Sequence, residues 1–129
     1  MSPTSQGAGR ALVAVYAVLA LSATARAVFQ VATKLQDAPL AYLLSLFASL
    51  VYIVATFALA TSRRRLAWAA VLTELAGVLV VGTVSLLAWE DFPDATVWSA
   101  FGQGYGYVPL VLPFLGVAWL VRTGRSGGR

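Results

Sequence analysis

The chain has 129 residues, of which 60% are hydrophobic and only 11% are charged, whereas a soluble globular domain carries about 25% charged residues. A soluble core of this size could not cover so much apolar surface, so part of the surroundings must be lipid. The chain contains no cysteine and no histidine, which excludes disulfides, thiol nucleophiles and the common zinc sites. The net charge of +4 does not indicate a nucleic-acid partner, because the charges lie at the ends of apolar runs.

Four apolar runs follow one another along the chain, each about 20 residues long, the length at which a helix crosses a bilayer. They cover residues 11–33, 39–60, 66–89 and 102–121. Because the connections are short, we expect an all-α membrane protein: four transmembrane helices in an antiparallel up-down bundle over residues 11–121. Residues 1–10 are small and polar and are predicted to be disordered, and residues 122–129 form a basic tail.

The basic residues predict the orientation of this bundle. One side of it carries seven arginines: Arg10, Arg63, Arg64, Arg65, Arg122, Arg125 and Arg129. The other side carries one lysine and four acidic residues: Lys34, Asp37, Glu90, Asp91 and Asp94. Cytoplasmic loops are enriched in Lys and Arg, so both termini are predicted to be cytoplasmic and the protein to be multi-pass in the cytoplasmic membrane.

The first span has a competing interpretation as a cleavable signal peptide. An A-x-A cleavage site fits at Ala23–Ala25 or at Ala25–Ala27, after a basic residue and a short apolar run. The apolar sequence AVFQVAT continues beyond that point, which favours a retained span. Cleavage would leave three spans with the same orientation, so the charges do not distinguish the two interpretations.

The third span, which contains VLTELAGVLVVG, carries a carboxylate at Glu74. Its neighbours at spacings of three and four are nearly all small: Ala67, Ala70, Gly77, Val81, Ser85 and Ala88. The opposite side is the predicted lipid face, with an indole near each interface: Trp68, Leu72, Leu75, Leu79, Gly82, Leu86 and Trp89. Small residues let helices approach closely, so Glu74 is expected to face other helices.

The second span carries a line of polar residues at alternating spacings of three and four: Tyr42, Ser45, Ser49, Tyr52 and Thr56. This rhythm predicts a packed helix seam, which could also be a ligand pathway. Tyr52 and Glu74 both lie about 12 Å from the cytoplasmic ends of their spans, which favours a hydrogen bond between them. Arg26 in the first span is about 10 Å further out, so it either snorkels to the headgroups or has a buried partner of its own.

The fourth span contains Pro109 and Pro113, which are four residues apart. Each proline removes a backbone donor and is predicted to bend the helix. Pro113 leaves the carbonyl of Pro109 without its usual partner, at the predicted depth of Glu74. Around the start of this span, Trp98, Phe101, Tyr105 and Tyr107 are expected to form an aromatic belt at the outer interface. A cationic-ligand cage is the alternative for these aromatic residues.

Three stretches resemble a family of small, uncharacterised actinobacterial four-span integral membrane proteins: DAPLAYLLSLFASLVYIVATFAL, ELAGVLVVGT and FPDATVWSAFGQGYGYVPLVLPFLG. The resemblance covers about residues 26–120 and implies four retained spans in the cytoplasmic membrane. It implies no substrate and no catalytic residue. The chain is less similar to the small multidrug-resistance exporters, whose essential Glu lies in the first helix, because here the first helix carries Arg26 and the carboxylate is in the third.

Two functions fit these features. The first is an accessory or structural membrane component that packs against itself or a larger complex, with Glu74 permanently neutral or fully paired. The second is a small proton-coupled transporter in which Glu74 titrates, since intramembrane ionisable residues often mark such pathways. For either function, the predicted intramembrane polar site comprises Glu74, Tyr52, Arg26, Ser45 and Ser49. The spans contain no nucleophile–base pair, metal cluster or paired carboxylates, so the sequence predicts neither an enzyme nor a cofactor.

Overall fold

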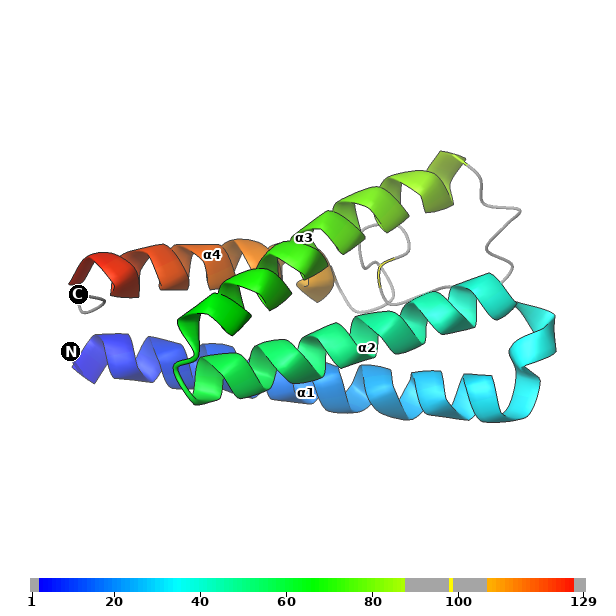
Figure 1. Ribbon diagram of the computed structural model, residues 1–129, viewed down its shortest axis with the longest axis horizontal. Coiled ribbons are helices and arrows are strands. Elements are labelled where there is room, and N and C mark those ends of the chain that lie inside the picture. Colours follow the sequence, from blue (N-terminus) through cyan, green and yellow to red (C-terminus); the bar gives the residue numbers. More distant parts are fainter. Residues whose placement is uncertain (1–2, 88–97, 99–106, 127–129) are drawn as a thin grey trace.

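A computed structural model of the chain describes residues 3–87, 98 and 107–126, which are mainly helical, and short turns join the first three long helices (Figure 1). The elements are α1 (Pro3–Lys34), a short 3-10 helix η1 (Leu35–Asp37), α2 (Pro39–Ala60), α3 (Arg64–Leu87) and α4 (Val108–Ser126). Each long helix packs against the next along the chain, whereas α1 and α4 make few contacts with each other. The N-terminal start of α1 and the C-terminal end of α4 lie at the same end of the bundle.

The turns between the first three helices have clear local causes. Pro39 is the first residue of α2, a position where its missing N–H has no helical partner to lose. The α2–α3 turn passes through Ser62, whose φ of 58° is left-handed. The N–H of Arg63 then donates a hydrogen bond of 2.9 Å to the carbonyl of Ala58, which closes the end of α2. These tight turns force α1, α2 and α3 to run antiparallel to their neighbours.

Three of the helices are long and apolar enough to cross a membrane. The apolar segments are Gly9–Asp37, Pro39–Ala60 and Arg64–Leu87, and α4 has a shorter one, Val108–Thr123. The predicted bounds of the second span, 39–60, are those of α2. The third span was predicted two residues later than α3 begins, and residues 88–89 and 102–106 of the predicted third and fourth spans lie outside the described residues.

Helical structure extends further at both chain ends than the sequence indicates. Residues 3–10 belong to α1, although 1–10 were predicted to be disordered, and α4 continues to Ser126 within the predicted tail. Pro3 suits the first position of a helix. Gly9 lies against the ring of Trp119 of α4, since a Cβ on Gly9 would meet that ring at 2.6 Å. This tertiary contact holds a segment whose own composition does not favour a helix.

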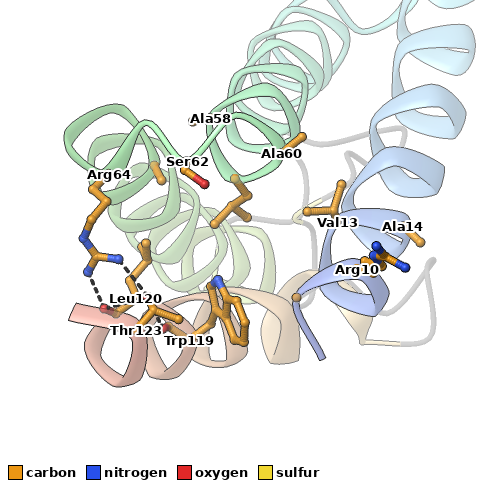
Figure 2. A pocket seen from close by; sticks show the side chains of 13 residues that line it. Arg10, Val13, Ala14, Ala58, Ala60, Ser62, Arg64, Trp119, Leu120 and Thr123 are labelled. Atoms are coloured by element: carbon orange, nitrogen blue, oxygen red, sulfur yellow. Dashed lines mark hydrogen bonds between the residues drawn. The ribbon is translucent and has the colours of Figure 1, made fainter. Parts of the chain in front are cut away.

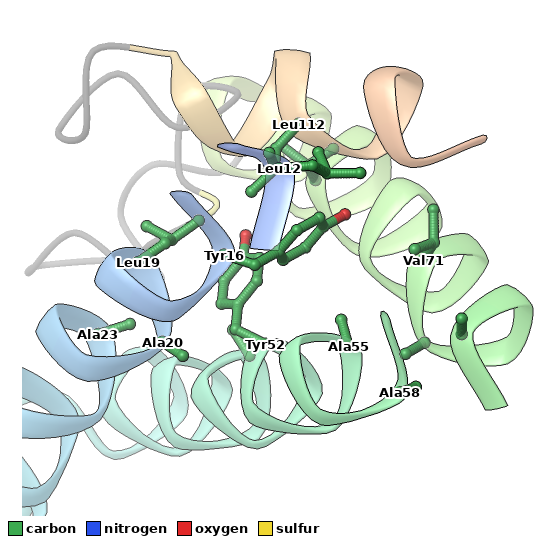
Figure 3. Close-up of a cluster of buried hydrophobic side chains, with 14 of the residues drawn as sticks. Leu12, Tyr16, Leu19, Ala20, Ala23, Tyr52, Ala55, Ala58, Val71 and Leu112 are labelled. Carbon is green, nitrogen blue, oxygen red and sulfur yellow. The ribbon is translucent and has the colours of Figure 1, made fainter. Parts of the chain in front are cut away.

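The helices meet through small side chains. Ala20 and Ala23 of α1 are buried, and so are Ala55 and Ala58 of α2 (Figure 3). Ala27 of α1 and Ala48 of α2 are buried as well. Large apolar side chains point outward instead: Leu21 is 74% exposed and Leu87 is 81% exposed. This inverted distribution is expected where lipid, not water, covers the outer surface, because small residues at the interface let the helix backbones approach closely.

The two prolines of α4 have different effects. Pro109 is the second residue of the helix, where a missing N–H costs no helical hydrogen bond, so the bend predicted at this residue is not required. Pro113 does lie inside the helix. Both rings are buried against the bundle. Any interruption of the α4 hydrogen-bond ladder therefore falls at Pro113, one turn before Gly116.

Candidate functional site

Glu74 lies in the middle of α3 and its side chain is fully buried. The α3 residues buried with it are Ala67, Ala70, Val71, Val78, Val81, Gly82 and Ser85. Ala67, Ala70, Val81 and Ser85 belong to the small-residue face expected from the sequence, and Leu72, Leu79 and Leu86 are exposed on the other side as expected. Gly77 of the expected face is half-buried, as are Trp68 and Leu75 of the opposite one, and Ala88 lies outside the described residues. Gly82 differs from its predicted lipid-facing position. A glycine presents only backbone, which the adjacent buried residues of the helix can cover.

The partner of the Glu74 carboxyl comes from α1. The hydroxyl of Tyr16 donates a hydrogen bond to Oε1 of Glu74, and both side chains are buried. Gly116 of α4 lies beside this contact, because a Cβ at Gly116 would come within 3.0 Å of the Tyr16 hydroxyl oxygen. The contact therefore lies where α1, α3 and α4 meet. The second carboxyl oxygen, Oε2, is buried and has no hydrogen-bond partner among the described residues.

Tyr52 lies on the other side of Tyr16. Their ring centroids are 6.5 Å apart, and the Tyr52 hydroxyl accepts a hydrogen bond of 2.6 Å from the indole N–H of Trp98. Trp98 is itself buried, so it does not lie in the predicted interfacial belt. The sequence predicted that Tyr52 donates a hydrogen bond to Glu74. In the structure the donor is Tyr16, which the predicted site did not include. The sequence does contain a signal for Tyr16, because it lies at helical spacing from Ala20, Ala23 and Ala27, the small residues that mark the buried face of α1.

Two hydroxyl side chains of the second span, those of Ser49 and Thr56, bond back to their own helix. Ser49 donates to the carbonyl of Leu46 over 2.7 Å, and Thr56 donates to the carbonyl of Tyr52 over 2.7 Å. Ser45 is buried on the same face of α2. Hydroxyls that bond to a carbonyl one turn earlier satisfy themselves within the helix. The predicted polar line is therefore a buried face of α2, with its contact to the rest of the polar site made by Tyr52.

Arg26 is separate from this group. Its side chain is exposed on α1, and in the described part of the chain it forms no ion pair with the fully buried Glu74. An exposed position suits a long side chain that reaches toward lipid headgroups. One helical turn away, Gln30 is 4% exposed, and its Oε1 has no hydrogen-bond partner among the described residues.

Glu74 lines neither of two cavities that lie among the described residues. The larger, of about 710 Å³, lies among Arg10, Arg64, Trp119 and other residues at the end of the bundle that holds the chain termini (Figure 2). The second, of about 590 Å³, is an apolar groove between α1 and α4. Within the described residues, no three His, Cys, Asp or Glu side chains gather to hold a metal ion. The carboxyl of Glu74 is thus enclosed by packed helices and does not face either cavity.

Comparison with known proteins adds no relative. No protein-family model, no curated protein and no solved structure matches the chain.

Proposed function

We propose that this chain is a four-span protein of the cytoplasmic membrane that acts as an accessory or structural component, packing against a second copy or a larger membrane complex. Three helices of spanning length and an outer surface of exposed large apolar side chains support the membrane location. The 16-residue apolar segment of α4 is about 24 Å long, which falls short of a hydrocarbon core of about 30 Å. The proposal that α4 crosses the membrane therefore depends on the apolar sequence that begins at residue 102, before the helix itself.

The arrangement of charge supports cytoplasmic termini. Arg64 of α3 donates hydrogen bonds to the Thr123 hydroxyl, over 2.7 Å, and to the Leu120 carbonyl near the end of α4. Arg10 lines the same cavity as Arg64, so these basic residues of three helices lie at one end of the bundle. Lys34 is the last residue of α1 and Asp37 the last residue of η1, so both lie at the opposite end of α1. An excess of arginine on one side is the pattern of a cytoplasmic face.

The observation that carries the structural role is the enclosure of Glu74. Its side chain has no exposed surface, it accepts a hydrogen bond from another helix, and it lines neither cavity. A transport carboxyl must exchange protons and cargo with water on each side in turn. A carboxyl that joins α3 to α1 within closely packed small residues instead fixes how the helices pack, a use known for buried polar groups in membrane bundles.

The test is modification of Glu74 by a hydrophobic carbodiimide in membranes, detected by intact mass across a range of pH. Such reagents enter lipid and attack protonated carboxyls, and the Glu74→Gln variant identifies any signal from other carboxyls. We expect no Glu74-dependent labelling of the wild-type protein at any pH. Partial unfolding with a denaturing detergent should then expose the carboxyl and restore labelling, which shows that the reagent was competent.

A proton-coupled transporter is the second candidate, and the Oε2 of Glu74, which has no partner among the described residues, favours it. A buried polar atom without a protein partner is often satisfied by water, and water near a carboxyl is what a proton pathway requires. In that case labelling would appear in native membranes and decline with a midpoint near neutral pH. That result would replace the structural role with the transport role.

A further inference from the structure

The cavity at the basic end of the bundle is lined by both polar and apolar residues. It has a volume of about 710 Å³ and is bounded by all four long helices. The polar residues of the lining are Arg10, Ser62, Arg64 and Thr123, and its apolar residues include Val13, Ala14 and Trp119. In Figure 2, Arg10 and Arg64 lie on opposite sides, with Trp119 between them. This volume is within the range of small-molecule sites, about 300–1,000 Å³, and the lining suits an amphiphile.

The charge at this end is not compensated within the described structure. Arg64 is held by Thr123 and by the Leu120 carbonyl. Arg10 has neither a hydrogen bond nor an ion pair with any described residue, and its side chain is exposed. The carboxylates of the described part are Asp37, beyond the far end of α1, and Glu74, buried inside the bundle. An anion at the cavity would therefore meet attractive charge and no nearby described carboxylate.

In the proposed membrane, the polar and the apolar residues that line the cavity lie at different depths. Arg10, Arg64 and Thr123 are close to the ends of the apolar segments, where lipid headgroups lie. Val13 and Ala14 follow Arg10 by about one helical turn, or about 5 Å, toward the hydrocarbon. In the proposed membrane the polar lining residues thus lie at the level of the headgroups, and the apolar ones lie at the start of the acyl chains. Arginine is well suited to phosphate there, because its planar guanidinium donates two parallel hydrogen bonds.

We propose that this cavity binds the phosphate headgroup of an anionic phospholipid from the adjacent leaflet. Arg10 recognises the charge, and the Trp119 side of the cavity covers the glycerol and the first acyl carbons. The proposal uses the membrane placement described under the proposed function, but it does not depend on whether Glu74 titrates. Binding is measured in detergent, so the outcome does not depend on which side of the membrane the termini occupy.

The experiment is native mass spectrometry of the full chain in detergent, titrated with phosphatidylglycerol or with zwitterionic phosphatidylcholine of the same acyl chains. We expect one phosphatidylglycerol to remain bound with an affinity at least about tenfold higher than that of phosphatidylcholine, since one charge-assisted hydrogen bond is worth about 1.5–3 kcal/mol. Equal retention of the two lipids would overturn the proposal, because it would indicate non-specific contact with the apolar surface.

Two variants locate the site, each with a matched control at the other end of α1. Arg10→Gln removes the charge, and Arg26→Gln removes an exposed arginine that does not line the cavity. Ala14→Phe fills the cavity from an exposed position, and Ala25→Phe makes the same exposed change elsewhere. The first member of each pair should weaken phosphatidylglycerol binding about tenfold, and the second should not. Equal effects within both pairs would contradict the assignment. Circular dichroism checks that each variant is folded.

Inorganic phosphate distinguishes a lipid headgroup from a soluble anion. We expect millimolar inorganic phosphate to leave the bound phosphatidylglycerol in place, because the anion alone lacks contacts with the apolar wall. Displacement of the lipid by inorganic phosphate at that concentration would contradict a lipid site and assign the cavity to a soluble phosphate-bearing ligand.

Discussion

The indole of Trp98 lies directly against Gly77 of α3, so that a Cβ on Gly77 would come within 2.5 Å of the ring carbons. The same indole forms an edge-to-face contact with Phe47 of α2, with ring centroids 6.1 Å apart. Its N–H reaches the hydroxyl of Tyr52. Trp98 therefore fills the space between α2 and α3, and the absence of a side chain at Gly77 makes that space available.

Substitution of Gly77 by alanine should destabilise the bundle by about 1–3 kcal/mol, the usual cost of overpacking. The effect opposes the gain of about 1 kcal/mol in helix propensity that alanine normally brings. Equilibrium unfolding in mixed micelles, followed by tryptophan fluorescence, measures it. Gly7→Ala is the control, because nothing lies within 4 Å of a Cβ built there. If Gly77→Ala were as stable as the wild type, Trp98 could not lie against Gly77.

The Tyr16→Phe variant should lose about 1–3 kcal/mol, because it leaves the buried Glu74 carboxyl without its described donor. Thr73→Val is a matched loss of a hydroxyl: Thr73 is exposed and bonds to the carbonyl of Ala69 in its own helix. It should change stability by no more than about 0.5 kcal/mol.

A double-mutant cycle isolates the Tyr16–Glu74 contact from other effects. The Glu74→Met substitution removes the carboxyl while keeping a side chain of similar length. In that background Tyr16→Phe should cost less than about 0.5 kcal/mol, because no buried acceptor is left unpaired. Additive losses would show that the two side chains act independently.

Much of the fold follows from apolar run length and periodicity. Residues 39–60 were predicted to form one helix, and α2 has those bounds. Spacings of three and four on the third span also identified the buried face around Glu74, because the small residues that allow close packing all lie on that side. These features depend only on a helix and its own side chains, so the sequence contains them directly.

The partners of the site depend on how one helix is rotated relative to another, which periodicity within a single helix does not determine. Tyr16 reaches Glu74 because the stripe of α1 that carries it faces both α2 and α3. Trp98 lies in a segment without helical periodicity, so nothing local indicated that it enters the bundle. Tyr52 lies beside Tyr16, with ring centroids 6.5 Å apart, but the depth estimate compared only Tyr52 with Glu74 and did not include Tyr16.

Arg64 joins the start of α3 to the end of α4, and its loss should loosen that end of α4. It donates to the Thr123 hydroxyl over 2.7 Å and to the Leu120 carbonyl. A cation near the last turn of a helix also interacts favourably with the helix dipole. Arg64→Gln should therefore make the last turn of α4 exchange amide hydrogens faster, by about tenfold for a loss of about 1.4 kcal/mol.

The neighbouring arginine provides the control for this change. Arg65 is exposed, and Arg65→Gln removes the same charge from the same turn of α3. Hydrogen–deuterium exchange of α4 in Arg65→Gln should match the wild type. Equal acceleration in both variants would attribute the effect to net charge and not to the bonds with Thr123 and Leu120.

The proposed topology gives a prediction that the absence of native cysteine makes simple to test, because a single introduced cysteine is the only thiol. Gln36→Cys in η1 should react with a membrane-impermeant maleimide on intact spheroplasts. Thr61→Cys in the α2–α3 turn, and a cysteine appended after Arg129, should react only after permeabilisation.

If Thr61→Cys were protected while the appended cysteine reacted from outside, α4 would not cross the membrane, and its apolar segment of about 24 Å would lie within one side of the bilayer. The reverse pattern at Gln36 and Thr61 would invert the orientation drawn from the arginines.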